Sequence, residues 1–391
     1  MHWLPSRKIV MVAAYAFLVG VSTQMLYSHL ALFLKFELNI SESRIGLIDG
    51  VAEFTSRLVR VFSGALSDYM GDRRFLLLVG CSLACLAKPI FSMVGSLGGI
   101  LFAEMLERLA SGIQACPRDA WVADLSIRVR LGESFGFLKS LKTLGTIFGA
   151  SAALALMYAS GGNYRILFAC ASIPTAIAVV FLLKIPATNS IRAASFKNPF
   201  RREYLKSLDL QFVFLMAVAF FCEFIHFGEA LMILRAGEIA SPTYAGLTAA
   251  AMGLGQTVLA YPIGILSDKY EKTFVLKVCM LLASIFYGAM DLIDAVFSFF
   301  ALVALIYGLH AAVQSVLLSM VVEIVSKKLH GTAIGIFHCL TGLAYLTAAR
   351  IFGNICEHSG YKVAFFCNAI VGIFGSCMVT LYQRHRAVFN R

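Results

Sequence analysis

Three ionisable side chains stand close together in a strongly apolar stretch of the chain, CEFIHFGEA at residues 222–230. Glu223, His226 and Glu229 recur at every third position, so on one helix they would lie within two turns. Histidine titrates near neutral pH, and a desolvated carboxylate can do so as well. These residue types at this spacing predict a site that takes up and releases a proton. The alternative is a hydrogen-bonded histidine with one carboxylate turned toward a polar crevice.

Two arginines have a carboxylate one helical turn away. Glu53 precedes Arg57 in GVAEFTSRLVR, and Glu104 precedes Arg108 in AEMLERLAS, so each pair shares a helix face. A guanidinium offers a planar fork of donors that suits carboxylate or phosphate. We therefore predict that these four residues line a cavity and favour a substrate with an anionic group. The alternative is an internal ion pair that only makes a buried charge tolerable.

Other polar side chains in the apolar runs are weaker candidates, because most such residues hydrogen-bond across helix contacts. They are Gln24, Tyr27 and His29, then Gln256 and Tyr261, then Tyr307, His310 and Gln314; of these, Gln24, Tyr27, Gln256 and His310 are the predicted substrate contacts. No GxSxG, HExxH or phosphate-binding loop accompanies them in the sequence. We expect neither an enzyme nor a cofactor.

The composition indicates which elements carry these residues. With 59% hydrophobic and 14% charged residues, a chain of 391 residues has too little polar surface for a water-soluble globule. Its apolar runs are long and do not alternate, which predicts membrane-spanning helices of about 20 residues and not strands. The run at 9–34 has full spanning length and predicts a retained helix, not a cleaved signal peptide. The ten cysteines lack metal-type spacing, so we predict no metal site.

The apolar runs predict an all-helical membrane protein with twelve transmembrane helices. The expected helices are 9–35, 44–68, 75–95, 98–126, 133–159, 165–184, 208–235, 243–267, 273–292, 296–325, 330–356 and 360–382. The longest polar connection divides them into an amino-terminal six-helix bundle (1–184), a cytoplasmic linker (185–207) and a carboxy-terminal six-helix bundle (208–391).

The net charge of +11 is spread over short loops and not gathered on one face, so we expect no nucleic acid partner. Short cytoplasmic segments keep an excess of lysine and arginine. Placing the amino terminus in the cytoplasm puts most loop cations on that side. We therefore expect both termini in the cytoplasm, lipid around the helices, and location in a bacterial inner membrane.

A short motif recurs in the two predicted halves. GALSDYMGDRR occupies 64–74, at the loop between the second and third predicted helices. GILSDKYEK occupies 264–272, at the equivalent loop between the eighth and ninth predicted helices. Repeated halves are the sequence signature of secondary transporters, which hold substrate at the repeat interface near the middle of the bilayer.

On these residues the chain resembles the major facilitator superfamily over essentially its whole length. The family loop motif, Gly-x-Leu-Ala-Asp-Arg-x-Gly-Arg-Arg, is matched by Gly64, Leu66, Ser67, Asp68, Gly71, Arg73 and Arg74. Tyr69 and Asp72 stand where the family usually has arginine. The helix 4 motif, Arg-x-x-x-Gly, is matched by Arg108 and Gly112. The resemblance implies two pseudo-symmetric six-helix bundles.

The resemblance also implies gating residues. In the family, the loop aspartate and an arginine cooperate with an aspartate at the end of helix 4 to latch the outward-facing state. Here Asp68 and Asp124 are available, and Arg73 or Arg74 would have to serve as the arginine. The predicted gating residues are Gly64, Asp68, Gly71, Arg73, Arg74, Arg118, Asp119, Asp124, Gly264 and Asp268.

Glycines in the fifth predicted helix resemble part of the family's antiporter motif. Gly136, Gly145 and Gly149 have its spacing, but Ala150 replaces its proline. Close helix packing is the alternative role for these small residues.

The sequence thus predicts a secondary active transporter that moves a small organic solute by alternating access, coupled to a proton. Import of a solute with an anionic group and efflux of drugs, endogenous metabolites or siderophores both remain open. A membrane sensor or scaffold that does not transport is the alternative of another class.

Overall fold

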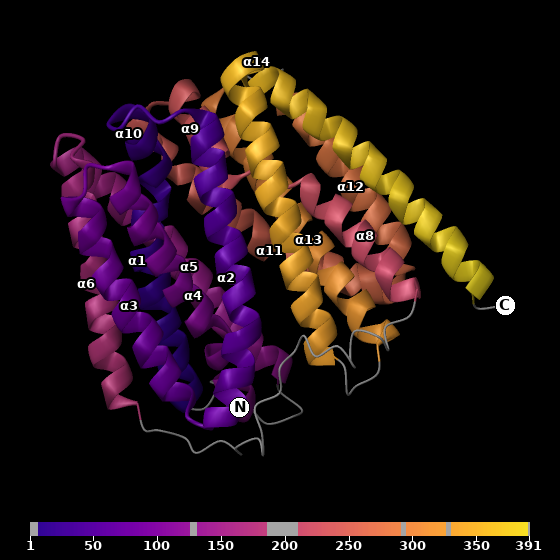
Figure 1. Ribbon diagram of the computed structural model, residues 1–391, viewed down its shortest axis with the longest axis horizontal. Helices are drawn as coiled ribbons and strands as arrows, with labels where there is room; N and C mark the ends of the chain where they lie inside the picture. Colours follow the sequence, from indigo (N-terminus) through magenta and orange to yellow (C-terminus); the bar gives the residue numbers. More distant parts are fainter. Residues whose placement is uncertain (1–6, 126–130, 186–209, 291–294, 326–329, 390–391) are drawn as a thin grey trace. The chain divides into compact units, whose positions relative to one another are not determined.

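A computed structural model of the chain describes residues 7–125, 131–185, 210–290, 295–325 and 330–389. Within these ranges every regular element is a helix. The first six helices are α1 (Arg7–Phe36), α2 (Glu42–Met70), α3 (Arg73–Met93), α4 (Leu97–Leu125), α5 (Leu131–Ala159) and α6 (Tyr164–Lys184), drawn from indigo to magenta in Figure 1. Each agrees with a predicted helix to within a few residues.

The later helices show one departure from the prediction. They are α8 (Leu210–Phe224), α9 (Glu229–Ile239), α10 (Pro242–Ala245), α11 (Leu247–Lys269), α12 (Lys272–Ala289), α13 (Val296–Ile324) and α14 (His330–Phe389). The single helix predicted over 208–235 is wrong, because the chain leaves the helix after Phe224 and re-enters it at Glu229. α14 turns at Gly360 (φ 83°) and forms the hairpin drawn in yellow in Figure 1, whose arms are the last two predicted helices.

Nine helical stretches in the described part of the chain are long and apolar enough to cross a membrane. α2 and α4 are not among them, and these are the helices that carry the predicted pairs of Glu53 with Arg57 and Glu104 with Arg108. The apolar composition therefore yields the expected helical membrane protein, with charge concentrated in two helices.

Contacts divide the chain into two compact units. Unit 1 comprises 1–38 and 55–198, and unit 2 comprises 39–54 and 199–391. The chain passes from one unit to the other inside α2, whose residues 42–54 belong to unit 2. The predicted bundle boundaries do not include this exchange, which assigns the first half of α2 to unit 2.

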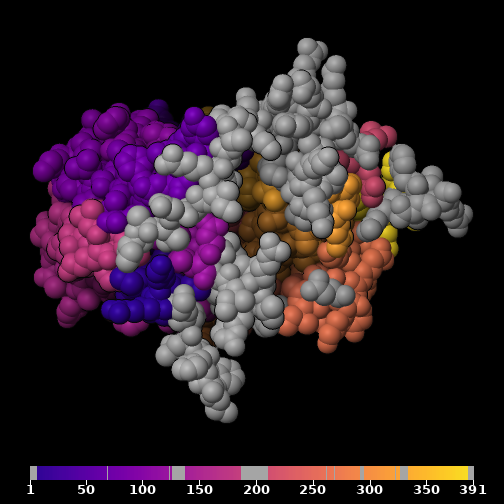
Figure 2. Space-filling model, turned by 90° about the horizontal axis from the view of Figure 1, so that it is seen from below, coloured from indigo at the N-terminus to yellow at the C-terminus, as the bar shows by residue number. Residues whose placement is uncertain are grey.

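In unit 1, α1 packs closely against α5. A methyl group added at Gly145 or Gly149 would collide with the carbonyl oxygens of Phe17 and Val21, so the two backbones touch. Gly145 and Gly149 thus permit close packing of two helices, which is the alternative role given above for the glycines of the fifth predicted helix. Elsewhere in unit 1, Tyr15 and Trp121 are fully buried in an apolar core to which α1, α3, α4, α5 and α6 contribute. Figure 2 looks onto the end of the molecule at which α6 ends.

In unit 2, α11 packs against α13 in the same way. Gly255 leaves no room for a methyl group beside the backbone of Ala304, and a methyl at Gly308 would lie 2.8 Å from the Gly255 carbonyl carbon. Small residues at the crossing points let the helices come together without a polar driving force. The same packing device thus holds helices together in each unit.

Candidate functional site: a broken helix in unit 2

Between α8 and α9 the chain is not helical, and side chains from three other helices hydrogen-bond to its backbone groups there. The Phe227 carbonyl accepts a hydrogen bond from the Tyr307 hydroxyl (2.6 Å), and the Phe227 amide donates to the Tyr287 hydroxyl (3.2 Å). Asn368 Nδ2 donates to the Ile225 carbonyl (3.0 Å). Irregular backbone is tolerated at membrane depth only where such partners replace the missing helical bonds. The break is therefore a supported feature of unit 2.

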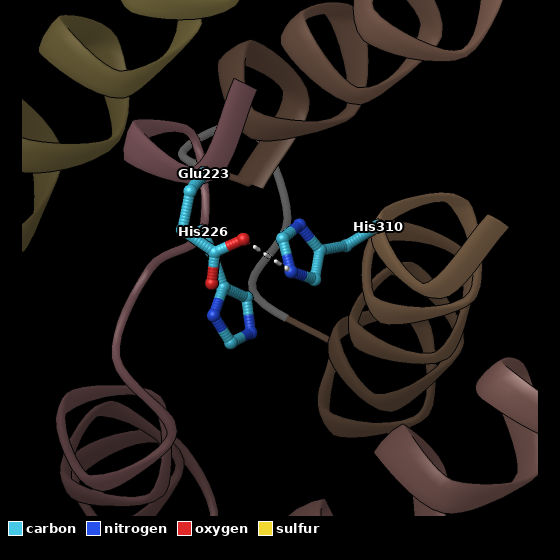
Figure 3. A group of neighbouring side chains, drawn as sticks. All are labelled: Glu223, His226 and His310. Atoms are coloured by element: carbon cyan, nitrogen blue, oxygen red, sulfur yellow. Dashed lines mark ion pairs between the residues drawn. The ribbon is translucent and has the colours of Figure 1, made fainter. Parts of the chain in front are cut away.

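Three ionisable side chains meet at this break, as Figure 3 shows. Glu223 is fully buried at the end of α8, and His226 follows in the break with 7% exposure. His310 comes from α13, and its Nε2 lies 3.6 Å from Glu223 Oε2. The imidazole rings of His226 and His310 stack with centroids 3.9 Å apart and planes 7° apart. We call Glu223, His226 and His310 the break cluster.

Aromatic and amide groups surround the break cluster. The Gln314 side-chain amide donates a hydrogen bond to Glu223 Oε2. The ring of His226 lies 5.1 Å from that of Tyr307 and 5.2 Å from that of Tyr345. A buried carboxylate is costly unless it is paired or protonated, and here it has both a histidine and an amide donor in reach. Glu223 therefore has two partners from α13, His310 and Gln314.

Two imidazoles and a carboxylate could also serve as ligands of a transition metal ion. Their ligand atoms all lie within 4.8 Å of one another. Ligand atoms of a tetrahedral zinc ion, with bonds of about 2.0–2.2 Å, lie roughly 3.3 Å apart. The stacked rings would have to reorient before both could point at one ion. As the rings lie, Glu223 forms an ion pair with His310 at 3.6 Å and accepts a hydrogen bond from Gln314, and the three residues do not point at one ion.

Glu229, the third residue of the predicted proton site, lies on the far side of the break. Its side chain is exposed, whereas Glu223 and His226 are buried. The prediction that the three share two turns of one helix is wrong, because residues 225–228 are not helical. The Glu229 amide donates a hydrogen bond to the Tyr345 hydroxyl (3.4 Å). Its backbone therefore contacts a tyrosine whose ring lies beside that of His226.

Unit 1 has a separate group of charged residues. Arg108 Nε donates to Glu104 Oε1 (3.0 Å), and the Arg108 guanidinium lies over the Tyr27 ring, 4.3 Å from its centroid. Behind it, Lys88 of α3 pairs with Glu107 of α4 (2.9 Å), and both side chains are almost fully buried. The predicted pair of Glu104 and Arg108 is present, and a tyrosine joins it from α1.

The other predicted solute contacts are less closely gathered. Glu53 and Arg57 are half-buried on α2, on either side of the point where the chain passes between units. Gln24 lies at the contact of α1 with α5, where a methyl group at Gly149 would be 3.0 Å from its Cβ. Gln256 is half-buried on α11 and, among the described residues, forms no hydrogen bond to the break cluster.

The loop motif in unit 1 forms a hydrogen-bonded group around Arg73. Arg73 Nε lies 3.3 Å from Asp124 Oδ2, and Arg73 Nη1 donates to Ser67 Oγ (2.6 Å). Arg74 donates instead to the carbonyls of Leu182 and Leu183 at the end of α6 (3.0 and 2.6 Å). Of the two arginines that could pair with Asp124, Arg73 is the one that does.

Gly71, which matches the family motif, and Asp72, which departs from it, shape the junction between α2 and α3. Gly71 has φ 68°, a left-handed conformation that glycine adopts without strain, and it separates α2 from α3. Asp72 accepts a hydrogen bond from the Phe75 amide (3.1 Å) and so caps the start of α3. An aspartate here stabilises the helix start, which an arginine would not do in the same way.

The remaining predicted gating residues are placed as follows. Arg118 pairs with its neighbour Asp119 (2.8 Å) on α4. Gly64 faces Cys116 of α4, with 3.4 Å from an added methyl group to Cys116 Cβ, whereas Gly264 on α11 has open space around it. The side chains of Asp68 and Asp268 lie outside the described residues.

Sequence reasoning missed Asp49, Tyr345, Tyr287 and Asn368. Asp49 is an acidic residue in the apolar run that also contains Glu53, so the criterion that selected Glu53 could have selected it. It accepts a hydrogen bond from the Tyr345 hydroxyl (2.6 Å). Tyr287 and Asn368 support the break through backbone contacts, and no local sequence pattern indicates such a role.

Comparison with known proteins identifies relatives along the whole chain. A sequence model of the Major Facilitator Superfamily matches residues 12–235 and 212–388. An uncharacterized MFS-type transporter of Methanocaldococcus jannaschii is 26% identical over 392 aligned positions, covering 96% of this chain and 94% of the relative.

Two solved structures share the fold. A POT family transporter in complex with 5-aminolevulinic acid has a TM-score of 0.80 at 12% identity, covering 98% of this chain and 99% of that one. The nucleoside transporter NupG has a TM-score of 0.76 at 12% identity, covering 96% and 99%. The chain therefore has the fold of these transporters, and the expected architecture is confirmed.

Proposed function

The chain belongs to the Major Facilitator Superfamily and is a membrane transporter, and we propose that it moves a small organic solute by secondary active transport coupled to a proton. The break cluster carries the proposal. Glu223, fully buried, has His310 at 3.6 Å, and His310 stacks on His226. In transporters of this general design, coupling ions bind at interrupted helices.

The geometry of the break cluster favours one proton per cycle. Two protonated imidazoles with centroids 3.9 Å apart would repel each other by about 4 kcal/mol at an effective dielectric constant of about 20. One protonated imidazole beside the Glu223 carboxylate is instead stabilised by the opposite charge. We therefore propose that the two histidines and Glu223 together carry one proton. Asp49, Glu229, Tyr307 and Tyr345 are the other ionisable groups around them.

The solute site is proposed to use the charged group of unit 1. Arg108 is held between Glu104 and the Tyr27 ring, and Arg57 and Glu53 lie half-buried on α2. An arginine that can exchange its carboxylate partner suits a solute with an anionic group. Gln24, Gln256 and His310 remain proposed polar contacts. Asp68, Asp124 and Arg73 are proposed to gate the cycle.

The proposed setting is a bacterial cytoplasmic (inner) membrane with both termini in the cytoplasm, as the loop charges favour. Large apolar side chains such as Met93 and Phe297 are 78% and 84% exposed on the helices. Lipid tails are the natural surroundings for such side chains in a chain of this composition.

The test is solute flux in sealed vesicles with an imposed pH gradient. A thermal-shift screen of the purified protein against carboxylates, amines, phosphates, siderophores and drugs supplies the solute, because binding raises apparent stability with ligand excess. We expect accumulation that follows the gradient and stops when an ionophore collapses it. Flux that does not respond to the gradient would show that no proton is coupled.

Two alternatives stay open, the direction of transport and a sensor or scaffold that does not transport, and flux measurements distinguish them. Import and efflux are separated by net flux measured from both sides of the membrane. A sensor or scaffold would give a stable protein that transports no solute of the panel.

A further inference from the structure

α2 is one continuous helix that belongs to both units. Its residues 42–54 group with unit 2, and residues 55–70 group with unit 1. Within unit 2, residues 42–54 pack against α14 with very little space between the backbones. A methyl group at Gly353 would lie 2.8 Å from the Glu42 carbonyl oxygen, and one at Gly46 would collide with the Ala349 carbonyl. We call residues 42–54 the docked half of α2.

Two hydrogen bonds and one ring contact lead from the docked half of α2 to the break cluster. The Tyr345 hydroxyl donates to Asp49 Oδ2 (2.6 Å) and accepts from the Glu229 amide (3.4 Å). The Tyr345 ring lies 5.2 Å from the His226 ring, at 38°. A methyl group at Gly228 would lie 3.4 Å from Asp49 Oδ2, so the carboxylate sits at the start of α9.

The carboxylate of Asp49 lies between a hydroxyl donor and the start of a helix. The amino-terminal end of a helix attracts negative charge, and α9 begins at this point with no side-chain cap of its own. A hydrogen bond from a hydroxyl to a carboxylate is strong and short. The Asp49–Tyr345 bond therefore holds the docked half of α2 to the same backbone segment that contains His226.

A second anchor holds the docked half of α2 but has a different position. Arg350 Nη1 donates to Ser43 Oγ (2.6 Å), and the Ser43 amide donates to Glu357 Oε2 (3.2 Å). These contacts lie beyond Asp49 toward the start of α2, on residues of α14 that follow Tyr345. The docked half thus has one anchor beside the break cluster and one away from it.

We propose that Asp49 and Tyr345 transmit the protonation state of the break cluster to α2, with both acting as positioning residues. This inference rests on the proposed proton coupling. A positive charge on His226 attracts Asp49 and competes with the Tyr345 hydroxyl for it, because charged donors form the stronger bonds to a carboxylate. We call the Asp49–Tyr345 hydrogen bond the link. The ionisable groups around it are Glu229 on α9, His226 in the break and Tyr307 on α13.

Because α2 is continuous, a change in its docked half reaches residues 55–70 in unit 1. That part of the helix contains Ser67, whose hydroxyl accepts a hydrogen bond from Arg73. α2 thus contains residues of both the proposed link in unit 2 and the proposed gate in unit 1.

Hydrogen exchange of the docked half measures the link directly. The full-length protein in lipid nanodiscs is compared by mass spectrometry with Asp49→Asn and Tyr345→Phe, at fixed pH and without solute. We expect exchange in residues 42–54 to become about tenfold faster in both variants, the size of effect expected for one charge-assisted hydrogen bond. Tyr244→Phe, which changes a tyrosine that is 51% exposed in the same unit, is expected to leave it unchanged.

A double-variant comparison tests transmission. We expect Glu223→Gln to change exchange in 42–54 by several-fold in the otherwise wild-type protein and in Arg350→Gln, but not in Tyr345→Phe, since Tyr345 contacts both Asp49 and His226 whereas Arg350 contacts Ser43. An equal effect of Glu223→Gln in the Tyr345→Phe background would overturn the proposal. So would unchanged exchange in folded Asp49→Asn and Tyr345→Phe proteins. If Tyr345→Phe does not fold, Asp49→Asn replaces it in the same comparison.

The outcomes separate this inference from the proposed function, because the exchange experiment uses neither solute nor gradient. Flux that ignores the pH gradient, together with transmission from Glu223 to residues 42–54, would refute proton coupling and keep the link. Gradient-driven flux with no transmission would refute the link alone.

Discussion

Glu223 is the residue on which proton coupling depends most directly. Its carboxylate is fully buried, with His310 Nε2 at 3.6 Å and a hydrogen bond from Gln314. Glu223→Gln keeps the size and an acceptor for Gln314 but cannot release a proton. We expect accumulation driven by a pH gradient to fall at least about tenfold, while exchange of solute at equal pH continues, because a fixed proton blocks only the coupled step.

Glu238→Gln is the matched control for Glu223→Gln. Glu238 pairs with Arg235 on α9 (2.7 Å) with 47% of its side chain exposed, so its loss should leave gradient-driven accumulation unchanged. Measurement of both activities in the same vesicles distinguishes uncoupling from general loss of protein. Full accumulation by Glu223→Gln would rule out Glu223 as the proton carrier.

Arg108 is the residue that we expect to select an anionic solute. Arg108→Lys keeps the charge but loses the planar fork and the face that lies on Tyr27. Affinity for an anionic solute should fall about tenfold or more, measured by thermal shift or equilibrium binding. Arg235→Lys is the control, because Arg235 also pairs with a glutamate and lies 5.6 Å from a tyrosine ring centroid. Equal affinities in the wild type and Arg108→Lys would contradict this role.

Residue types predicted two of the three members of the break cluster as parts of a proton site. Glu223 and His226 could be found because charged and polar residues are conspicuous in an apolar run. Their association with His310 could not, because His310 comes from α13 and sequence spacing carries no information on contacts between distant helices. Asp49 was missed although it is as conspicuous as Glu53, and only the fold shows that it accepts from Tyr345.

Within the elements, Lys88 and Glu107 hold α3 against α4 inside unit 1. Lys88→Met would leave Glu107 buried without its cation, and breaking one side of a buried pair destabilises a protein by about 3–5 kcal/mol. We expect a clearly lower unfolding temperature for Lys88→Met. Lys88→Met combined with Glu107→Leu should recover most of the loss, since no charge is then left unpaired. A double variant as unstable as the single one would contradict this explanation.

Helix positions were predictable because apolar runs and turn residues fix where a chain can cross a membrane. The break at 225–228 was not, because IHFG contains no proline and continues the apolar run. The break depends on Tyr287, Tyr307 and Asn368, which replace the lost helical hydrogen bonds from three other helices. Such support is a property of packing and leaves no local pattern. The turn at Gly360, in contrast, carries a glycine with positive φ and was expected.

Across the whole molecule, the two repeats are alike in packing and unlike in chemistry. Close glycine contacts join α1 to α5 and α11 to α13. Unit 1 pairs its buried charges as Glu104 with Arg108 and Lys88 with Glu107, whereas unit 2 gathers titratable groups at a broken helix. This difference supports the proposed division of roles, in which unit 1 binds a solute with an anionic group and unit 2 exchanges the proton.

Alternating access also requires a device that sets how long each state lasts, and Arg73 is our candidate for it. Arg73 bridges Asp124 of α4 and Ser67 of α2 at the loop motif. We expect Arg73→Gln to lower the maximal transport rate about tenfold with little change in solute affinity, because the variant alters the balance of states and not the binding contacts. Initial rates over a range of solute concentrations separate the two quantities.

Asp72→Ala is the informative comparison for Arg73→Gln, since it changes the position where the family usually has arginine. Asp72 caps α3 through the Phe75 amide, so its loss should cost about 1 kcal/mol of stability and leave the transport rate intact. If Asp72→Ala slowed transport as much as Arg73→Gln, the cap itself would be part of the gate. If Arg73→Gln changed affinity and rate together, the loop group would be acting on the solute site instead of on the balance between the two states.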